Sequence, residues 1–344
     1  MKIVIDQAIP FVQGVFEPYA DVVYREGAAI CRDDIKDADA LLTRSRTRCD
    51  EALLKGTRVK IIATATIGTS HIDIPWCEKN GIFFKTAAGS NAGGVMNYVI
   101  SAMYGAAARK SIPLTGSTVG IVGAGSTGKR VEAAVRTLGF KTLVYDPPRA
   151  EAEGPGQFCS LRELLEGSDI VSLHLPVNDR TRDIANADFF SCMRHGALFI
   201  NASNGGLVNE DDLINFAPKL GPIIIDTWKG EPDINRRLMD IADIATPHIA
   251  GYSYQGKQNA TAMAVRAVAR FFSISELYEY FPPTEFEGLE AVKLDLRGKT
   301  QGEITSMIQY NYPVFTDDFM FRINPEGFEE IRTNYRYRRE FFTD

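Results

Sequence analysis

The sequence contains few cysteines, and their spacing fits neither a structural metal site nor a disulfide framework. Five cysteines occur among 344 residues, and no two form a CxxC pair. An odd number of widely spaced cysteines fits a reducing compartment. We therefore expect no structural disulfide and no bound metal.

Long hydrophobic runs and a basic excess are also missing. The longest mostly apolar stretch, residues 95–108, is too short to span a bilayer. The formal net charge is −6, whereas a nucleic-acid-binding surface normally has an excess of Lys and Arg. The apolar start of the chain is interrupted by Asp6 and predicts a first strand rather than a signal peptide. We expect a soluble cytoplasmic protein without nucleic-acid or membrane partners.

Short apolar segments alternate with amphipathic ones along most of the chain. Buried parallel strands are predicted at residues 2–5, 40–43 and 60–64, with helical segments at 50–54 and 74–80. This alternation indicates a small α/β domain in the first ~90 residues.

A second α/β region follows a helix predicted at residues 93–110. A later helical pattern covers residues 256–272 and is broken at Pro282-Pro283. The last ~60 residues are richer in Tyr, Phe and Arg and indicate a separate small module. Within the second region we expect strands at residues 117–122, 141–145, 170–174, 197–201 and 222–226, and helices at 127–138, 161–166 and 209–216.

A glycine-rich turn stands between a strand of this second region and the helix that follows. Gly123, Gly125 and Gly128 form a G-x-G-x-x-G pattern. The first glycine permits a tight turn, the second lets a pyrophosphate approach the backbone, and the third lets helix and strand pack closely. At the start of the helix, Ser126 and Thr127 would offer unpaired N–H groups to the phosphates.

An acid at the end of the next strand favours NAD as the bound dinucleotide. Asp146 lies 18 residues after Gly128, close to the ~20 expected for a residue that binds the ribose hydroxyls. A carboxylate there repels the 2′-phosphate of NADP, although Arg149 could pair with such a phosphate. The plainer interpretation is a turn without a ligand and an N-cap aspartate.

Two residues near the end of the second region are candidates for proton transfer. His248 lies in the segment ATPHIAGY and Glu231 in DTWKGEPD. A carboxylate beside an imidazole orients the ring and raises its pKa, so the pair could exchange the proton that accompanies hydride transfer. The alternative is that Glu231 begins a helix and His248 caps a strand, and spacing alone does not decide.

The segment RSRTR, residues 44–48, is the densest basic cluster of the first domain. It follows a predicted strand directly, and α/β domains bind ligands at the carboxyl ends of parallel strands. Arginine pairs bidentately with phosphate or carboxylate, so Arg44 and Arg46 are candidate anion ligands. A solvated basic loop is the alternative.

Six motifs, in order, resemble the NAD-dependent D-2-hydroxyacid dehydrogenases over nearly the whole chain. They are IATATIGTSHID, GIVGAGSTG, SLHLPVNDRT, LFINASNGGLV, DTWKGEP and TPHIAGY. The segments ADALLTRSRT, YDPPRA, TPHIAGYSYQGK and FEEIRTNYRYRRE narrow the resemblance to one group within that family. The resemblance implies NAD-linked oxidation of 4-phospho-D-erythronate to the 2-oxo acid, an early step in making pyridoxal 5′-phosphate.

The resemblance also implies an α/β fold with two Rossmann-like domains and a small C-terminal α+β module. Residues 1–92 and 251–282 would form a flavodoxin-like substrate domain, with an NAD-binding domain inserted at residues 93–250. Residues 283–344 would form the dimerisation module of a homodimer.

Roles for single residues follow from the same resemblance. His248 would be the acid–base and Glu231 its partner, while Ser45, Thr66 and Tyr252 would contact the substrate. The phosphate would be bound by Arg44 and Arg46. In addition to the glycine-rich turn, the cofactor site would contain Asp146, His174, Pro176, Asp226 and Gly251.

One position departs from the family pattern. Family members carry an arginine after the strand that here reads FINASNGG, and that arginine holds the substrate carboxylate, whereas this chain has Asn204. Asn gives one neutral hydrogen bond where Arg gives two charge-assisted ones. Three hypotheses stay open: an enzyme in which Arg44, Arg46 or a partner-chain arginine replaces the missing one, a dehydrogenase for another D-2-hydroxy acid, and a catalytically weak NAD-binding relative.

Overall fold

The computed structural model describes residues 1–284 and 287–343, and the chain divides into two compact units. The first unit contains residues 1–91 and 254–288, and the second contains residues 92–253 and 289–344. Within the predicted C-terminal module, residues 285–286 and 344 lie outside the described residues. In the described part of the chain, no helix is both long and apolar enough to cross a membrane.

The first unit is built on a five-stranded parallel sheet in the order β2-β1-β3-β4-β5. This is the flavodoxin-like order, in which the chain changes direction across the sheet between β1 and β3. The strands are β1 (Lys2–Asp6), β2 (Asp21–Arg25), β3 (Ala40–Thr43), β4 (Ile61–Thr64) and β5 (Phe83–Thr86). The helices are α1 (Arg32–Ile35), α2 (Glu51–Leu54), α3 (Ile74–Lys79) and α11 (Tyr254–Phe272), with 3-10 turns at Gly27–Ala29 and Ser275–Leu277.

Two apolar clusters hold this sheet, one on each face. Ile3 and Ile5 of β1 pack with Val265 and Val268 of α11, while Val4 points to the other cluster with residues of the short helices α1 to α3. The three predicted strands are confirmed to within one residue. The two edge strands β2 and β5 were not predicted, because their residues are only half-buried and lack a continuous apolar run.

The second unit has a six-stranded parallel sheet in the order β11-β10-β9-β8-β6-β7. Its strands are β6 (Thr118–Val122), β7 (Lys141–Tyr145), β8 (Ile170–Leu173), β9 (Leu198–Asn201), β10 (Ile223–Ile225) and β11 (Ile244–Ala245). Its helices up to residue 241 are α4 (Ala92–Arg109), α5 (Ser126–Thr137), α6 (Pro147–Glu153), α7 (Leu161–Gly167), α8 (Ala187–Cys192), α9 (Glu210–Phe216) and α10 (Arg236–Ile241). Short 3-10 turns occur at Pro155–Gln157, Gly205–Leu207 and Ala217–Lys219.

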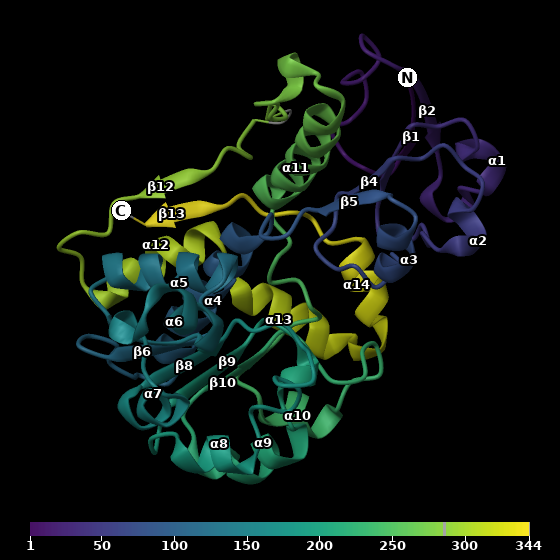
Figure 1. Ribbon diagram of the computed structural model, residues 1–344. Coiled ribbons are helices and arrows are strands. Elements are labelled where there is room, and N and C mark those ends of the chain that lie inside the picture. Colours follow the sequence, from purple (N-terminus) through teal and green to yellow (C-terminus); the bar gives the residue numbers. More distant parts are fainter. Residues whose placement is uncertain (285–286, 344) are drawn as a thin grey trace. The chain divides into compact units, whose positions relative to one another are not determined.

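Helices cover both faces of this second sheet. In Figure 1 its strands run between α4, α5 and α13 on one side and α7 to α10 on the other. The two corresponding apolar clusters contain Val99 and Val131 on one face, and Leu164 and Phe190 on the other. The predicted α/β class with parallel sheets is therefore confirmed for both units.

The C-terminal residues pack with the second unit. They form β12 (Val292–Leu294), α12 (Gln301–Asn311), α13 (Val314–Ile323), a 3-10 turn (Pro325–Gly327), α14 (Phe328–Thr333) and β13 (Phe341–Thr343). Ile308 and Phe341 join the cluster around α4, and Phe321 packs against Trp228 with ring centroids 6.1 Å apart. The sequence predicted a separate module here, but these buried apolar contacts place residues 289–344 in one compact unit with residues 92–253.

Candidate active site

The glycine-rich turn has the geometry that its pattern predicts. Gly123 has φ of +93° and donates its N–H to the Tyr145 carbonyl at 2.8 Å. A Cβ at position 128 would lie 2.0 Å from the Gly123 carbonyl oxygen, whereas one at Gly125 would meet nothing within 4 Å. The third glycine thus permits helix–strand packing, and the second leaves open backbone in front of α5, which begins at Ser126. This open cradle fits a pyrophosphate.

Asp146 closes β7 beside that turn. Its carboxylate accepts hydrogen bonds from the Ala124 N–H at 2.7 Å and the Arg149 N–H at 3.1 Å, so it is also the N-cap of α6. The Arg149 guanidinium forms a bidentate ion pair with Glu153, at 2.7 and 2.6 Å. Because Arg149 is already paired, the site favours a ribose without a 2′-phosphate, as in NAD.

His174 follows β8, which neighbours β6 in the sheet. The chain order reverses between these two strands, and open α/β sheets bind ligands at such a point. A Cβ at Gly123 would lie 2.8 Å from the His174 carbonyl oxygen, so the two loop starts are in close contact. Burial lowers the pKa of His174 to about 4, and both ring nitrogens lack a partner among the described residues. A neutral imidazole therefore adjoins the turn, with Pro176 two residues further on.

A fully buried carboxylate organises the loop after β11. Asp226 accepts hydrogen bonds from the Thr246 hydroxyl at 2.7 Å, the Ile249 N–H at 2.8 Å and the Ala250 N–H at 3.0 Å. Burial raises the pKa of Asp226, while these donors and the nearby His248 oppose that rise. Its observed contacts position the loop, which continues into Gly251.

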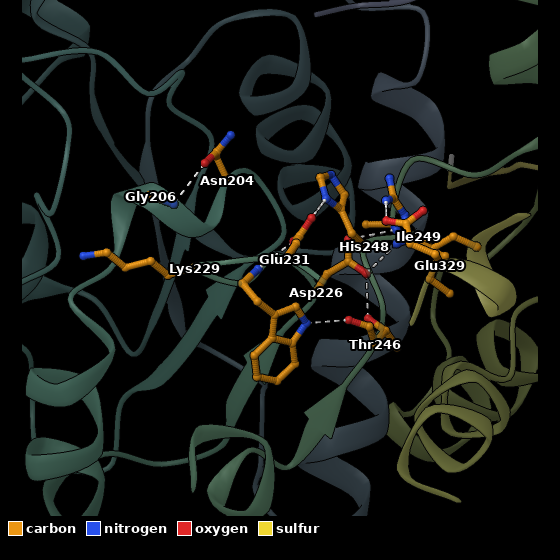
Figure 2. Close-up of polar contacts among 12 residues, drawn as sticks. Asn204, Gly206, Asp226, Lys229, Glu231, Thr246, His248, Ile249 and Glu329 are labelled. Carbon is orange, nitrogen blue, oxygen red and sulfur yellow. Dashed lines mark hydrogen bonds and ion pairs between the residues drawn. The ribbon is translucent and has the colours of Figure 1, made fainter. Parts of the chain in front are cut away.

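His248 and Glu231 are brought together by this loop. His248 Nδ1 lies 2.7 Å from Glu231 Oε2, and the other carboxylate oxygen accepts the Trp228 N–H at 2.8 Å (Figure 2). Burial lowers the pKa of His248, but the hydrogen bond and charge of Glu231 and the charge of Asp226 raise it above its ordinary value. His248 has φ of +56°, a conformation that is costly for a residue with a side chain and is held by the surrounding contacts.

The alternative interpretation of these two residues is wrong. Glu231 lies in a turn and begins no helix, and His248 follows β11 without capping it through its side chain. The imidazole is 38% exposed, so its Nε2 side is accessible while Nδ1 is occupied. The arrangement can accept or donate one proton at Nε2.

Asn204 does not reach this pair. Its side-chain oxygen accepts the Gly206 N–H at 2.9 Å and caps the turn Gly205–Leu207, and the residue is exposed. In Figure 2 the dashed line from Asn204 runs to Gly206, away from Glu231 and His248. The side chain is therefore bound to its own turn.

The C-terminal segment contributes contacts that the sequence did not predict. Arg338 donates to the carbonyls of Ile249 at 3.2 Å, Tyr252 at 3.0 Å and Gly94 at 3.1 Å, and also to that of Ala250. The ring of Tyr252 packs against Tyr335, with centroids 5.8 Å apart. The loop that carries His248 is thus held by residues about ninety positions later in the chain, for which local spacing gives no signal.

In the first unit, the basic cluster lies where its strand position predicts. Arg44 follows β3 and donates to the Ala8 carbonyl after β1 at 3.1 Å, so it bridges the two loops where the strand order reverses. Ser45 and Arg46 are exposed. Thr66, after β4, shares a hydrogen bond of 2.7 Å with the Thr64 hydroxyl.

Lys257 is an additional cation near Arg44 that the sequence did not predict. Burial and the charge of Arg44 lower the pKa of Lys257 to about 8. It belongs to the first turn of α11, far from β3 in the sequence. The two cations give this unit a local positive charge within an acidic chain, which suits an anionic ligand.

Comparison with known proteins agrees with this geometry. Residues 96–250 match the family model of the D-isomer specific 2-hydroxyacid dehydrogenase, NAD binding domain. The chain is 37% identical to an erythronate-4-phosphate dehydrogenase of Bacteroides fragilis, over 99% of this chain and 97% of the relative. An Escherichia coli erythronate-4-phosphate dehydrogenase is 36% identical, over 99% of this chain and 92% of the relative.

Solved structures of related folds were also found. NAD⁺-bound 3-phosphoglycerate dehydrogenase of Entamoeba histolytica is 27% identical with a TM-score of 0.65, and the match covers 83% of this chain and 99% of that one. D-Lactate dehydrogenase of Aquifex aeolicus, complexed with NAD and lactic acid, has a TM-score of 0.61 at 23% identity, covering 83% of this chain and 100% of that one.

Proposed function

Because the chain belongs to the D-2-hydroxyacid dehydrogenase family, we propose that it oxidises 4-phospho-D-erythronate to (R)-3-hydroxy-2-oxo-4-phosphooxybutanoate with NAD, in the formation of pyridoxal 5′-phosphate. The observation that carries the chemistry is the His248–Glu231 pair, whose side chains lie 2.7 Å apart and come from two loops of the second unit. Relatives that match the whole chain support the substrate. They give no support to the alternative of a catalytically weak relative marked by Asn204.

In this reaction NAD supplies the acceptor for the hydride that leaves C2 of the substrate. His248 Nε2 takes the proton of the C2 hydroxyl, because Nδ1 is occupied by Glu231. Glu231 stabilises the imidazolium that results and fixes the ring tautomer. In the reverse direction the same nitrogen returns the proton to the carbonyl oxygen.

We assign the cofactor to the carboxyl edge of the second sheet. The positive φ at Gly123 and the open space at Gly125 support a pyrophosphate site, and paired Arg149 supports NAD over NADP. The assigned residues are Gly123, Gly125, Ser126, Thr127, Gly128, Asp146, His174, Pro176, Asp226 and Gly251.

We assign substrate contacts within each unit by itself. In the first unit Arg44 and Arg46 would bind the phosphate, supported by the bridging position of Arg44, while Ser45 and Thr66 would contact the substrate. In the second unit Tyr252 would contact the substrate. Its place on the loop that carries His248 supports this role.

We also propose that the protein works in the cytoplasm as a homodimer through its C-terminal residues. Exposed large apolar side chains on α12 and α13 support this interface: Tyr310, Phe319, Met320 and Ile323. Large apolar side chains exposed on adjacent turns of one helix, as at Phe319, Met320 and Ile323 of α13, are typical of a protein-binding surface.

The test is an NAD-reduction assay with purified protein and 4-phospho-D-erythronate. We expect the wild type to form NADH. In His248→Gln we expect kcat to fall by at least about 100-fold, because general acid–base groups typically contribute 10²–10⁴-fold. The dissociation constant for NADH, measured by fluorescence, should not change in that variant. No turnover with this substrate, alongside turnover of another D-2-hydroxy acid, would contradict the proposed substrate.

A further inference from the structure

The carboxylate of Glu231 is held at both of its oxygens. Oε2 lies 2.7 Å from His248 Nδ1, and Oε1 accepts the backbone N–H of Trp228 at 2.8 Å. Glu231 follows β10 and His248 follows β11, so the contact between their side chains depends on how two separate loops are placed. A displacement of about 1 Å at a reacting group can cost about 100-fold in rate. The bonds that join these two loops therefore bear on the chemistry.

Trp228 joins the two loops through its side chain. Its indole N–H donates to the Thr246 carbonyl at 2.8 Å, a bond drawn in Figure 2 as a dashed line that ends at Thr246. The residue is 3% exposed, so this bond is shielded from water. Thr246 stands directly after β11, and its own N–H donates to the Ile225 carbonyl of β10 at 3.0 Å. Trp228 thus bonds Glu231 through its backbone and the segment of His248 through its ring.

The residue that accepts the indole bond is itself fixed in place. The Thr246 hydroxyl donates to Asp226 Oδ1 at 2.7 Å and lies 2.7 Å from the hydroxyl of Tyr98 in α4. A threonine hydroxyl has one proton, and here Asp226 accepts it, so Tyr98 is the donor to Thr246. All three residues are fully buried. The indole N–H therefore bonds a residue that cannot shift without breaking other buried hydrogen bonds.

Further contacts attach the turn of Trp228 to other parts of the second unit. Its ring packs against Phe321 of α13, with centroids 6.1 Å apart. A Cβ at Gly205 would collide with the Trp228 carbonyl, so the turn lies directly on the segment after β9. The next residue, Lys229, donates its N–H to Glu210 at 2.8 Å. These contacts attach the turn to α13, α9 and the end of β9, whereas the indole N–H attaches it to the loop after β11.

A residue that only filled space here would not need a polar atom in its ring. Burying an indole N–H costs free energy unless the group finds an acceptor. The chain has two tryptophans, and the second is Trp76 in α3. Within the part of the chain that the structure describes, the half-buried indole of Trp76 makes no hydrogen bond. The two residues therefore offer a comparison between a bonded and an unbonded indole.

We propose that Trp228 is a positioning residue for the acid–base pair: its indole N–H fixes the turn of Glu231 against the segment of His248 and so maintains the contact between carboxylate and imidazole. This assignment rests on the proposed function, in which His248 takes the proton of the C2 hydroxyl. Trp228 acts through Glu231. Without the indole bond, the Thr246 carbonyl loses a buried donor and the turn is no longer tied to the loop after β11.

The experiment uses the full-length protein and two replacements of Trp228. Trp228→Phe removes the N–H together with part of the ring. A benzothiophene in place of the Trp228 indole, incorporated in the Trp76→Phe background, removes the N–H and keeps the ring volume. Trp76→Phe alone is the matched control. Asp226 and Arg332, the other charged residues that act on His248, are unchanged in every variant.

Four properties are measured on each variant. NMR titration of the cofactor-free protein gives the pKa of His248 without turnover. Exchange of the indole proton with water, also followed by NMR, tests the bond to Thr246 in the wild type. Steady-state NAD reduction with 4-phospho-D-erythronate gives kcat and KM at a temperature where every variant is folded. Fluorescence titration gives the affinity for NADH.

We expect both replacements of the Trp228 indole to lower kcat about 10-fold, with KM and NADH affinity within about 3-fold of the wild type. The pKa of His248 should fall, because a displaced Glu231 stabilises the imidazolium less. In the wild type, the indole proton of Trp228 should exchange at least about 100-fold more slowly than that of Trp76. Trp76→Phe should have the kcat and the His248 pKa of the wild type.

Three results would overturn the assignment. The first is an indole proton of Trp228 that exchanges as fast as that of Trp76. The second is a wild-type kcat and a wild-type His248 pKa in the benzothiophene variant. The third is a parallel loss of activity and NADH affinity with an unchanged His248 pKa, which would make Trp228 an ordinary core residue. If the wild type does not oxidise 4-phospho-D-erythronate, the proposed function is wrong, and the NMR measurements alone decide the role of Trp228.

Discussion

At the scale of single residues, the site depends on how the charge of one residue changes the pKa of its neighbour. Glu231 holds His248 Nδ1 and raises the pKa of the imidazole, although burial lowers it. Oxidation requires neutral His248 as the proton acceptor, so the rate should rise as pH increases through that raised pKa. The pH at which the oxidation rate rises therefore measures the pKa of His248 in this pair.

Replacing Glu231 by glutamine should damage both the tautomer and the pKa. A glutamine N–H facing Nδ1 favours the tautomer protonated at Nε2, which cannot accept the substrate proton. We expect kcat for oxidation to fall about 100-fold or more, in line with the cost of a wrong tautomer in other His–carboxylate pairs. The remaining activity should have its rising limb at lower pH than the wild type. A limb at unchanged pH in kcat/KM profiles would contradict this role for Glu231.

Lys257 should make phosphate binding depend on pH. Burial and the charge of Arg44 lower its pKa to about 8, below the ordinary value of a lysine. The cation is therefore present below about pH 8 and lost above it, so KM for a phosphorylated substrate should rise as pH increases beyond 8. In Lys257→Met we expect a KM about 10-fold higher at pH 7, little change in kcat, and no further rise at high pH.

The control for that variant is Lys55→Met, because Lys55 is an exposed lysine of the same unit paired with Glu51 at 2.9 Å. Initial-rate measurements from pH 6.5 to pH 9.5 cover the relevant interval on either side of the lysine pKa. If KM of the wild type and Lys257→Met rose in parallel above pH 8, Lys257 would not be the titrating group.

Residue patterns predicted those parts of the site that lie close together in the sequence. Gly123, Gly125 and Gly128 form one turn, and its chemistry can be inferred from three positions. His248 and Glu231 were found because few histidines exist and a carboxylate occurs nearby. Lys257 was not found, since it approaches Arg44 from a helix that is distant in sequence. A local sequence pattern does not indicate a contact between segments that lie far apart in the chain.

At the scale of elements, burial decided which segments could be predicted. Fully buried strands such as β3 and β8 consist mostly of apolar residues, and their predicted bounds are correct to within one residue. Edge strand β2 has only a weak alternation of apolar and polar residues, and it was not predicted from the sequence. The C-terminal segment was predicted to form its own module because its composition differs, but composition does not reveal that Phe321 and Phe341 are fully buried in the second unit.

We expect the C-terminal segment to act, through Arg338, as a clamp: its hydrogen bonds would hold in place the loop after β11 that carries His248. Arg338 donates hydrogen bonds to the backbone carbonyls of Ile249, Ala250 and Tyr252, which follow His248 in the chain. Methionine at position 338 fills a similar volume but leaves these carbonyls unpaired. Because bonds to a charged donor contribute about 1.5–3 kcal/mol, we expect the thermal midpoint to fall by about 3–10 °C.

The same variant should lose activity beyond what reduced stability explains. At a temperature where Arg338→Met is fully folded, kcat should be about 10-fold lower, because the ring of His248 loses its fixed orientation. Calorimetry and steady-state assays on the same preparation separate the two effects. Arg336→Met is the control, and equal kcat in Arg338→Met and wild type would exclude a positioning role for the clamp.

At the scale of the whole molecule, the proposed homodimer requires a surface through which two copies would meet. Phe319, Met320 and Ile323 of α13 are 59%, 48% and 58% exposed, and Tyr310 of α12 is 84% exposed. Exposing large apolar side chains on adjacent turns of α13 is unfavourable in water, so a second copy that covered them would be stabilised by their burial. Helix α13 also packs against β11, close in sequence to the catalytic loop.

The double variant Phe319→Glu/Ile323→Glu should therefore be a monomer in light scattering at a concentration where the wild type is a dimer. Two carboxylates placed opposite their own copies would repel each other and would lose hydration in the interface. NADH affinity should remain within about 3-fold of the wild type, since the glycine-rich turn lies on a different element. Phe281→Glu, at another exposed aromatic, serves as the control for a general effect of added charge. A dimer that persists in the double variant would show that the two copies meet through a different surface.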